Sequence, residues 1–270
     1  MAEKDFFTMD LKDTNKDRGG FISTGIEKLD KLLEGGTPKG FSVLILGTPG
    51  SSIEILSKQL ASHSAKTLYV STEETETEIL ETMKRFKWEN QNLKILDIAS
   101  MYSQAILSGE EKRVSVYEQR SKVKLKELIE IGSQGMPSLA QGGTDFLAVL
   151  SNKIKDSKYE KIIVNSLDFF LSQHNQEEVI RTLQAAKISN LHNKSILYIV
   201  MTRGIHGDIF ERKMEGMADC VLELEVLQKG SAFERFLAVK KMKNYAKKIG
   251  IARYTIDSDG FVLEMIERIM

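Results

Sequence analysis

The residues best suited to chemistry form a short loop at positions 47–54, GTPGSSIE, which follows an apolar run and precedes a helical pattern. In the phosphate-binding pattern G-x-x-x-x-G-K-[ST], backbone N–H groups cradle phosphates, the lysine reaches the β- and γ-phosphates, and the hydroxyl binds Mg²⁺. The first five positions suit such a loop: Gly47, Thr48, Pro49, Gly50 and Ser51. The last three, which should be glycine, lysine and Ser/Thr, are here Ser52, Ile53 and Glu54.

These three replacements all oppose binding of a nucleoside triphosphate. Ile53 removes the cation, Glu54 places an anion near the phosphates, and Ser52 adds a Cβ where backbone must approach them. A lost charge-assisted contact costs about 1.5–3 kcal/mol. Two such losses weaken binding roughly a hundredfold or more. The alternative is that this segment is an ordinary strand–turn–helix corner.

The elements around the loop predict an α/β fold with a mostly parallel sheet and flanking helices. Apolar runs rich in β-branched residues alternate with helical patterns, which is typical of a sheet covered on both faces. The expected strands are 42–47, 67–71, 93–98, 161–166, 195–201 and 220–226, and the expected helices are 53–63, 75–87, 143–156 and 176–193. Three further runs, 234–244, 252–257 and 261–266, predict an antiparallel C-terminal hairpin region.

We expect a polar N-terminal tail at 1–20 and one domain at 21–270, with an insertion at about 100–143. Within the insertion, 110–131 predicts a helix with an apolar side, and 132–143 predicts a mobile loop. The alternative is an ordinary crossover helix with a long exit.

Composition narrows the function classes. With 38 basic and 38 acidic residues the formal net charge is zero, so nucleic acid is not indicated as a partner. The single cysteine, Cys220, and the lack of a long apolar segment predict a cytoplasmic protein without a membrane span. The four histidines have no ligand spacing, and no metal site is expected.

Nine positions before the loop carry a family resemblance. Residues 22–52 resemble the opening of KaiC/RadA-like domains of the RecA superfamily, of the archaeal KaiC-like type, but with a degenerate P-loop. The matching residues are Ser23, Gly25, Leu29, Asp30, Leu33, Gly35, Gly36, Pro38 and Gly40. The resemblance implies a RecA-like, P-loop NTPase fold over roughly 21–98 and 158–266.

Further site residues follow from this resemblance. Glu73 and Glu74 match the glutamate pair that activates the attacking water, although acidic residues also favour a helix N-terminus. Asn165 stands where the family has an aspartate that holds Mg²⁺ through water. Lys241 and Lys243 match a Lys and an Arg that reach the neighbouring subunit's γ-phosphate, although they also suit a solvated edge strand.

We therefore expect a non-hydrolysing pseudo-ATPase that serves as a binding, assembly or regulatory module. It would form a homo-oligomer or bind a protein partner, with no cofactor and with Glu73 and Glu74 vestigial. The alternative is a divergent ATPase in signalling or in DNA recombination and repair. That enzyme would bind ATP together with Mg²⁺. The lost phosphate-binding lysine would be replaced by Lys39, by Lys58, or by Lys241 from a neighbouring copy of the chain.

Overall fold

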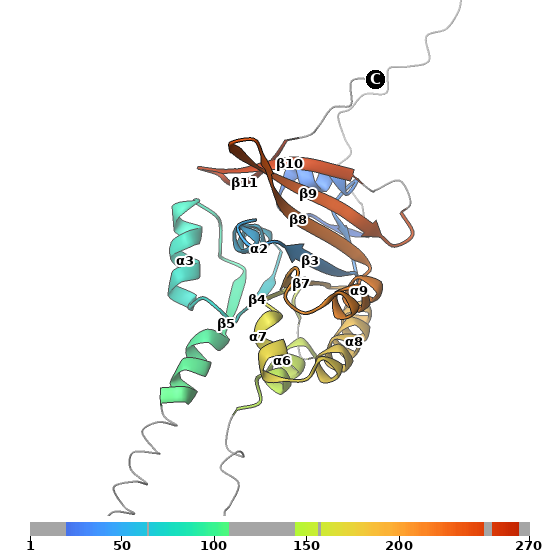
Figure 1. Ribbon diagram of the computed structural model, residues 1–270. Helices are drawn as coiled ribbons and strands as arrows, with labels where there is room; N and C mark the ends of the chain where they lie inside the picture. The colour runs from blue at the N-terminus through green and yellow to red at the C-terminus, as the bar shows by residue number, and fades with distance from the viewer. Residues whose placement is uncertain (1–19, 64, 108–143, 156–157, 246–249, 265–270) are drawn as a thin grey trace, which may run out of the picture.

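The computed structural model describes residues 20–63, 65–107, 144–155, 158–245 and 250–264 (Figure 1). Most of the expected insertion, including its predicted helix at 110–131 and loop at 132–143, lies outside these residues, as does nearly all of the expected N-terminal tail. Residues 98–107, at the start of the insertion, are helical.

Within the described residues, nine strands form one sheet in the order β11-β10-β9-β8-β3-β7-β6-β4-β5. The strands from β8 to β5 in this order are mutually parallel, and β9, β10 and β11 continue the sheet in antiparallel pairing. The strands are β3 (Ser42–Gly47), β4 (Thr67–Ser71), β5 (Leu93–Asp97), β6 (Lys161–Asn165), β7 (Ile196–Thr202), β8 (Cys220–Lys229), β9 (Ala232–Met242), β10 (Gly250–Asp257) and β11 (Gly260–Glu264). The predicted fold class, a mostly parallel sheet with an antiparallel C-terminal region, is confirmed.

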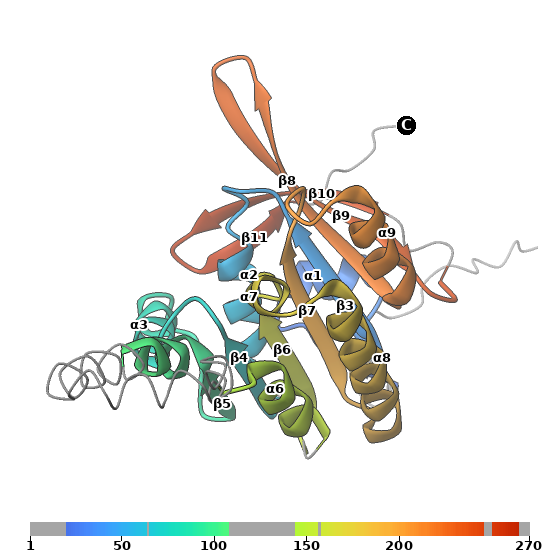
Figure 2. The same cartoon turned by 60° about the horizontal axis from the view of Figure 1, so that its bottom comes forward.

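Helices cover both faces of the sheet (Figures 1 and 2). One face carries α1 (Glu27–Leu32), α2 (Ile53–Ala61) and α3 (Glu76–Arg85). The other carries α6 (Phe146–Lys155), α7 (Asp168–Gln173), α8 (Gln176–Asn193) and α9 (Asp208–Met217). Successive side chains of a strand point to opposite faces, so Val43 and Ile45 of β3 enter the first core and Leu44 and Leu46 the second. This division explains why the strands read as continuous apolar runs.

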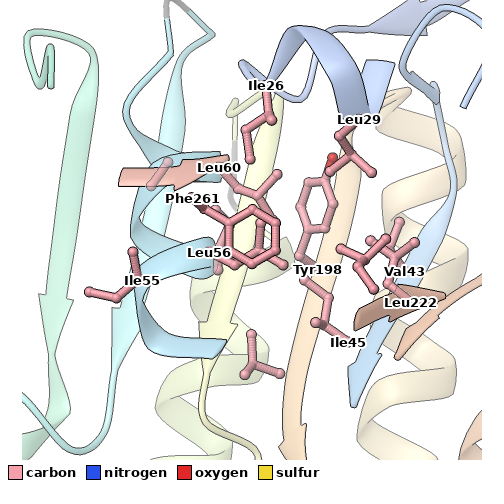
Figure 3. Close-up of a cluster of buried hydrophobic side chains, with 14 of the residues drawn as sticks. Ile26, Leu29, Val43, Ile45, Ile55, Leu56, Leu60, Tyr198, Leu222 and Phe261 are labelled. Atoms are coloured by element: carbon pink, nitrogen blue, oxygen red, sulfur yellow. The ribbon is translucent and has the colours of Figure 1, made fainter. Parts of the chain in front are cut away.

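The C-terminal strands close the first core. Phe261 of β11 and Tyr254 of β10 are buried and stack at 4.2 Å between ring centroids. Figure 3 shows Phe261 beside Leu56 and Leu60 of α2, with Tyr198 of β7 in the same cluster. The antiparallel region therefore packs against the helix that follows the loop.

The turn before β3 is held by one carboxylate. Asp30 accepts hydrogen bonds from the backbone and hydroxyl of Thr24, each at 2.7 Å, and from the Ser23 hydroxyl at 2.5 Å. Gly36 has a φ of +107°, and a Cβ there would lie 2.5 Å from the Ile22 carbonyl oxygen. Ser23, Asp30 and Gly36, which match the family pattern in the sequence, therefore have a structural role in forming this turn. The same turn is flanked by a short pair of strands, β1 (Phe21–Ile22) and β2 (Thr37–Pro38).

Four features of the described residues were not predicted from the sequence: the β1–β2 pair, the helices α7 and α9, and the helix at 98–107. Helix α7 has only six residues, follows β6 almost directly and has no side-chain cap, so it leaves little helical pattern in the sequence. Helix α9 contains Gly216, which lowers helix propensity. Among the described helices, none is long and apolar enough to cross a bilayer.

Candidate functional site

The loop predicted from the sequence is a strand–loop–helix corner, as expected. Strand β3 ends at Gly47 and α2 begins at Ile53. Bonds to distant strands hold the corner: the Thr48 amide donates to the Leu224 carbonyl at 3.0 Å, and the Tyr254 hydroxyl donates to the Ser51 carbonyl at 2.6 Å. The loop conformation is therefore supported by the C-terminal half of the chain.

Ser52 has a left-handed backbone, with φ +56° and ψ +38°. It occupies the position where the phosphate-binding pattern has its second glycine, and a non-glycine residue there carries a backbone cost of about 1–2 kcal/mol. Its side chain makes no capping hydrogen bond to α2. The loop thus has, at position 52, a backbone conformation that favours glycine, although the residue there is a serine.

A pocket of about 430 Å³ lies at this corner. Its walls come from the carboxyl ends of β3, β4, β6 and β7, which is where α/β sheets place their ligands. The lining residues are Gly47, Thr48, Pro49, Gly50, Ser51, Ser52, Ile53, Glu54, Glu73, Glu74, Asn165, Ser166, Val200 and Thr202. The structure therefore brings together the whole predicted loop, the predicted acidic pair and Asn165.

Ile53 lies back over the loop. A Cβ built on Gly47 would be 2.8 Å from Ile53 Cδ1 and 2.7 Å from Ser51 Oγ, so these two side chains close over the first glycine. Ile53 also packs against the core beneath α2. The side chain at the lysine position is thus part of the apolar packing of the corner.

Each of the two predicted glutamates has one engaged oxygen. Glu74 Oε1 lies 2.6 Å from the ammonium of Lys58, whose side chain is only 2% exposed. Glu74 Oε2 is buried and has no hydrogen-bond partner. Glu73 Oε1 accepts from the Ser166 hydroxyl at 2.7 Å.

Asn165 ends β6 at the base of the pocket and is 2% exposed. The Asn165–Ser166 peptide bond is cis, and Thr72 bonds to both residues: its amide donates to the Asn165 carbonyl, and its hydroxyl oxygen accepts from the Ser166 amide.

Tyr69 of β4 lies next to this site. Burial raises the pKa of Tyr69 well above its usual range. A hydrogen bond with the Ser57 hydroxyl opposes this shift, and the carboxylates of Glu74 and Glu73 add to it. Tyr69 is therefore a neutral hydroxyl at ordinary pH.

The two predicted trans-acting lysines lie outside this pocket. Lys241 Nζ donates to the carbonyls of Glu215 and Gly216, each at 2.9 Å, near the C-terminal end of α9. Lys243 lies 3.7 Å from Asp219 and is 57% exposed. Contact with a neighbouring subunit's ligand stays a prediction for both. Lys39 lines a separate hollow at the amino end of the sheet, with Lys158 and Lys194.

Sequence reasoning missed two parts of the site. The pairing of Lys58 with Glu74 joins α2 to the end of β4, and the bond from Tyr254 joins β10 to the loop. No local signal was available for the first: Lys58 lies two residues from both Leu56 and Leu60, and residues at this spacing do not share a helix face. Its burial is visible only in the structure.

Sheet order and corner together define a protein of the RecA-like α/β class. The family model described as "ATPase: KaiC" matches residues 22–268, so the chain belongs to the KaiC ATPase family. The fold resembles the crystal structure of a KaiC-like protein from Pyrococcus horikoshii, with a TM-score of 0.64, 16% identity, and 91% of this chain and 99% of that chain covered.

Curated relatives agree with this assignment. A UPF0273 protein of Pyrococcus horikoshii is 22% identical over 252 residues, which are 90% of this chain and 93% of that protein. The circadian clock oscillator protein KaiC of Rippkaea orientalis is 22% identical over 88% of this chain, which spans only 43% of that protein. The DNA repair protein RadA of Aquifex aeolicus is 40% identical over 86 residues, which are 31% of this chain and 19% of RadA.

Proposed function

We propose that this chain is a KaiC-family protein that does not hydrolyse ATP and that serves as a binding or assembly module. The observation that carries the proposal is Ile53, which stands at the lysine position and packs over Gly47 and against the core. A phosphoryl group in this loop would meet a methyl group in place of an ammonium. Phosphoryl transfer depends mainly on positioning and charge stabilisation, so the loss falls on catalysis itself.

The nearest lysine is a poor replacement. Lys58 is buried on α2, and its ammonium is held at 2.6 Å by Glu74. Turning Lys58 toward the loop would break this pair and leave a partly buried carboxylate without its cation, which costs about 3–5 kcal/mol. Glu54 at the Mg²⁺ hydroxyl position and Asn165 at the aspartate position add to the mismatch. Ile53, Glu54 and Asn165 thus give three separate reasons for the same proposal.

A protein with this fold and no nucleotide chemistry would act through its surfaces. We propose that it self-associates or binds a protein partner, as a RecA-like scaffold without the triphosphate between its subunits. The β8–β9 ribbon offers one exposed element: beyond Leu224, β8 is paired with β9 alone, and the ribbon projects from the sheet (Figure 2). Leu227 and Phe233 on this ribbon are exposed.

The test is a restored loop measured beside the wild type. The variant Ser52→Gly/Ile53→Lys/Glu54→Thr/Asn165→Asp should bind Mg²⁺–ATP in isothermal titration calorimetry. The matched control keeps Ser52→Gly, Glu54→Thr and Asn165→Asp but carries Ile53→Met, which supplies a long side chain without charge. Wild type should show no heat of binding and no phosphate release, and the control should bind at least about tenfold more weakly than the restored variant.

Two results would contradict the proposal. Turnover of ATP by the wild type would show a working enzyme, and the missing cation would then be sought in a neighbouring copy. Equal binding by the restored variant and the Ile53→Met control would show that the residue at position 53 does not decide affinity.

A further inference from the structure

The pocket at the corner has the electrostatic character of a cation site. The carboxylates of Glu54, Glu73 and Glu74 line it, and no Lys, Arg or His is among the described residues of its wall. Two cations lie near this wall: Lys58 pairs with Glu74 from behind, and the Arg235 guanidinium donates to the Gly50 carbonyl at 3.3 Å. The N-terminus of α2 contributes only about half a positive charge, so the wall is net negative.

Two buried polar atoms in this wall lack partners. Ser51 is 1% exposed, and its hydroxyl points over Gly47 into the loop without a hydrogen bond. Glu74 Oε2 is likewise buried and unpartnered. Buried polar groups are nearly always satisfied in native proteins, and a carboxylate oxygen can only accept. Glu74 Oε2 therefore calls for a ligand that donates a hydrogen bond, and the Ser51 hydroxyl oxygen can accept a bond from the same kind of ligand.

From this geometry we infer that the pocket binds a primary ammonium group on an alkyl chain, as in the lysine side chain of a partner protein or a free diamine. This inference rests on the proposed function, because a bound triphosphate would occupy the same loop. An ammonium has three N–H donors and no acceptor, which matches an unpaired carboxylate oxygen and an unpaired hydroxyl on different elements. Pro49, Ile53 and Val200 supply apolar wall for the methylene groups.

A metal ion fits this pocket less well. Among the residues that the structure describes, no three His, Cys, Asp or Glu side chains are grouped to hold one. Divalent cations such as Ca²⁺ take six to eight oxygen ligands, and here each glutamate of the pair has already engaged one oxygen. An ammonium needs fewer acceptors and tolerates the neutral amide of Asn165.

The probe is N-acetyl-lysine N-methylamide, titrated into the full chain and followed by NMR chemical shifts. N-acetyl-norleucine N-methylamide, which has a closely similar shape but no charge, is the matched ligand control. Saturable shifts confined to loop residues 47–54 and to Glu74 are expected with the lysine probe and not with the norleucine probe. Affinity should fall as salt is raised, because the pocket is partly open to solvent. Cadaverine, a free diamine, is titrated in the same way. Tighter binding of cadaverine would identify a free diamine as the ligand, and tighter binding of the lysine probe would identify a lysine side chain of a partner protein.

Two variants localise the site. Ser51→Ala and Glu54→Gln should each weaken lysine-probe binding at least fivefold while the fold is kept. Glu76→Gln, on the exposed first turn of α3 and outside the pocket wall, should leave it unchanged.

Equal binding of the lysine and norleucine probes, or no response to either ammonium ligand, would overturn the inference. If Mg²⁺–ATP is also silent in that case, the proposed function stands and the ammonium site alone is wrong. Binding and hydrolysis of Mg²⁺–ATP would instead refute the proposed function.

Discussion

Lys161 provides a quantitative test of how dry the interior of this protein is. It is the first residue of β6 and has no exposed surface. Its ammonium donates to the Leu60 carbonyl at 3.1 Å and lies 3.5 Å from the Thr24 carbonyl. Burial lowers the pKa of Lys161 from 10.5 to about 8, and the carboxylates of Asp30 and Glu160 offset only part of this shift.

The sign of the pH dependence follows from proton binding. Between pH 8 and 10.5 the unfolded chain keeps the proton on Lys161 and the folded protein releases it. The unfolding free energy therefore rises with pH in this window, whereas below pH 8 both states are protonated and the full cost of burying the charge remains. The difference between a pKa of 10.5 and one of about 8 corresponds to about 3 kcal/mol.

The measurement is urea denaturation of wild type and Lys161→Met at several pH values between 7 and 10.5. The difference between their unfolding free energies isolates Lys161, because the other titrating groups are shared. Wild type should gain about 3 kcal/mol relative to the variant across this range. Lys213→Met, at an exposed position of α9, is the control for loss of a lysine as such. A difference that stays flat from pH 7 to 10.5 would show that Lys161 reaches water, and would refute the reasoning.

Three further predictions concern the site, the packing and the assembly. Lys58→Met should lower the unfolding free energy by about 3 kcal/mol, and adding Glu74→Gln should recover most of it in a urea double-mutant cycle; strictly additive effects would mean that the 2.6 Å pair is not coupled. Gly260→Ala should lower stability by about 1–3 kcal/mol, because Gly260 has a φ of +104° and its Cβ would lie 2.2 Å from Trp88 Cζ2; an unchanged melting temperature would contradict this. Light scattering at tens of micromolar should show a dimer or ring, and a strict monomer would count against self-association.

The sequence predicted the scaffold better than the contacts at the site. The β3–α2 corner could be predicted because an apolar run, a glycine-rich loop and a helical pattern follow one another along the chain. Helix α8 was predicted at 176–193 and observed there, since its cap Asn175 and its apolar spacing are local signals. The Lys58–Glu74 pair could not be predicted in this way, because it depends on how α2 lies against the end of β4.

Residue types at the site were equally readable, but their orientations were not. The sequence shows an isoleucine at position 53, yet only the structure shows that its side chain lies over Gly47. Similarly, the Ser51 hydroxyl and Glu74 Oε2 are ordinary polar groups in the sequence. Their lack of hydrogen-bond partners depends on every element that surrounds them.

The order of strands in the sheet also constrains how the chain can fold during synthesis. Strand β3 is the central strand before the loop, and both of its neighbours, β7 and β8, come from much later in the chain. Its first residue, Ser42, bonds to Asp219, 177 residues away. Folding slows as contacts become less local. A nascent chain that ends before β7 leaves both edges of this apolar strand unpaired, a state prone to aggregation. The strand that leads into the corner is therefore synthesised before both of the strands that complete its pairing.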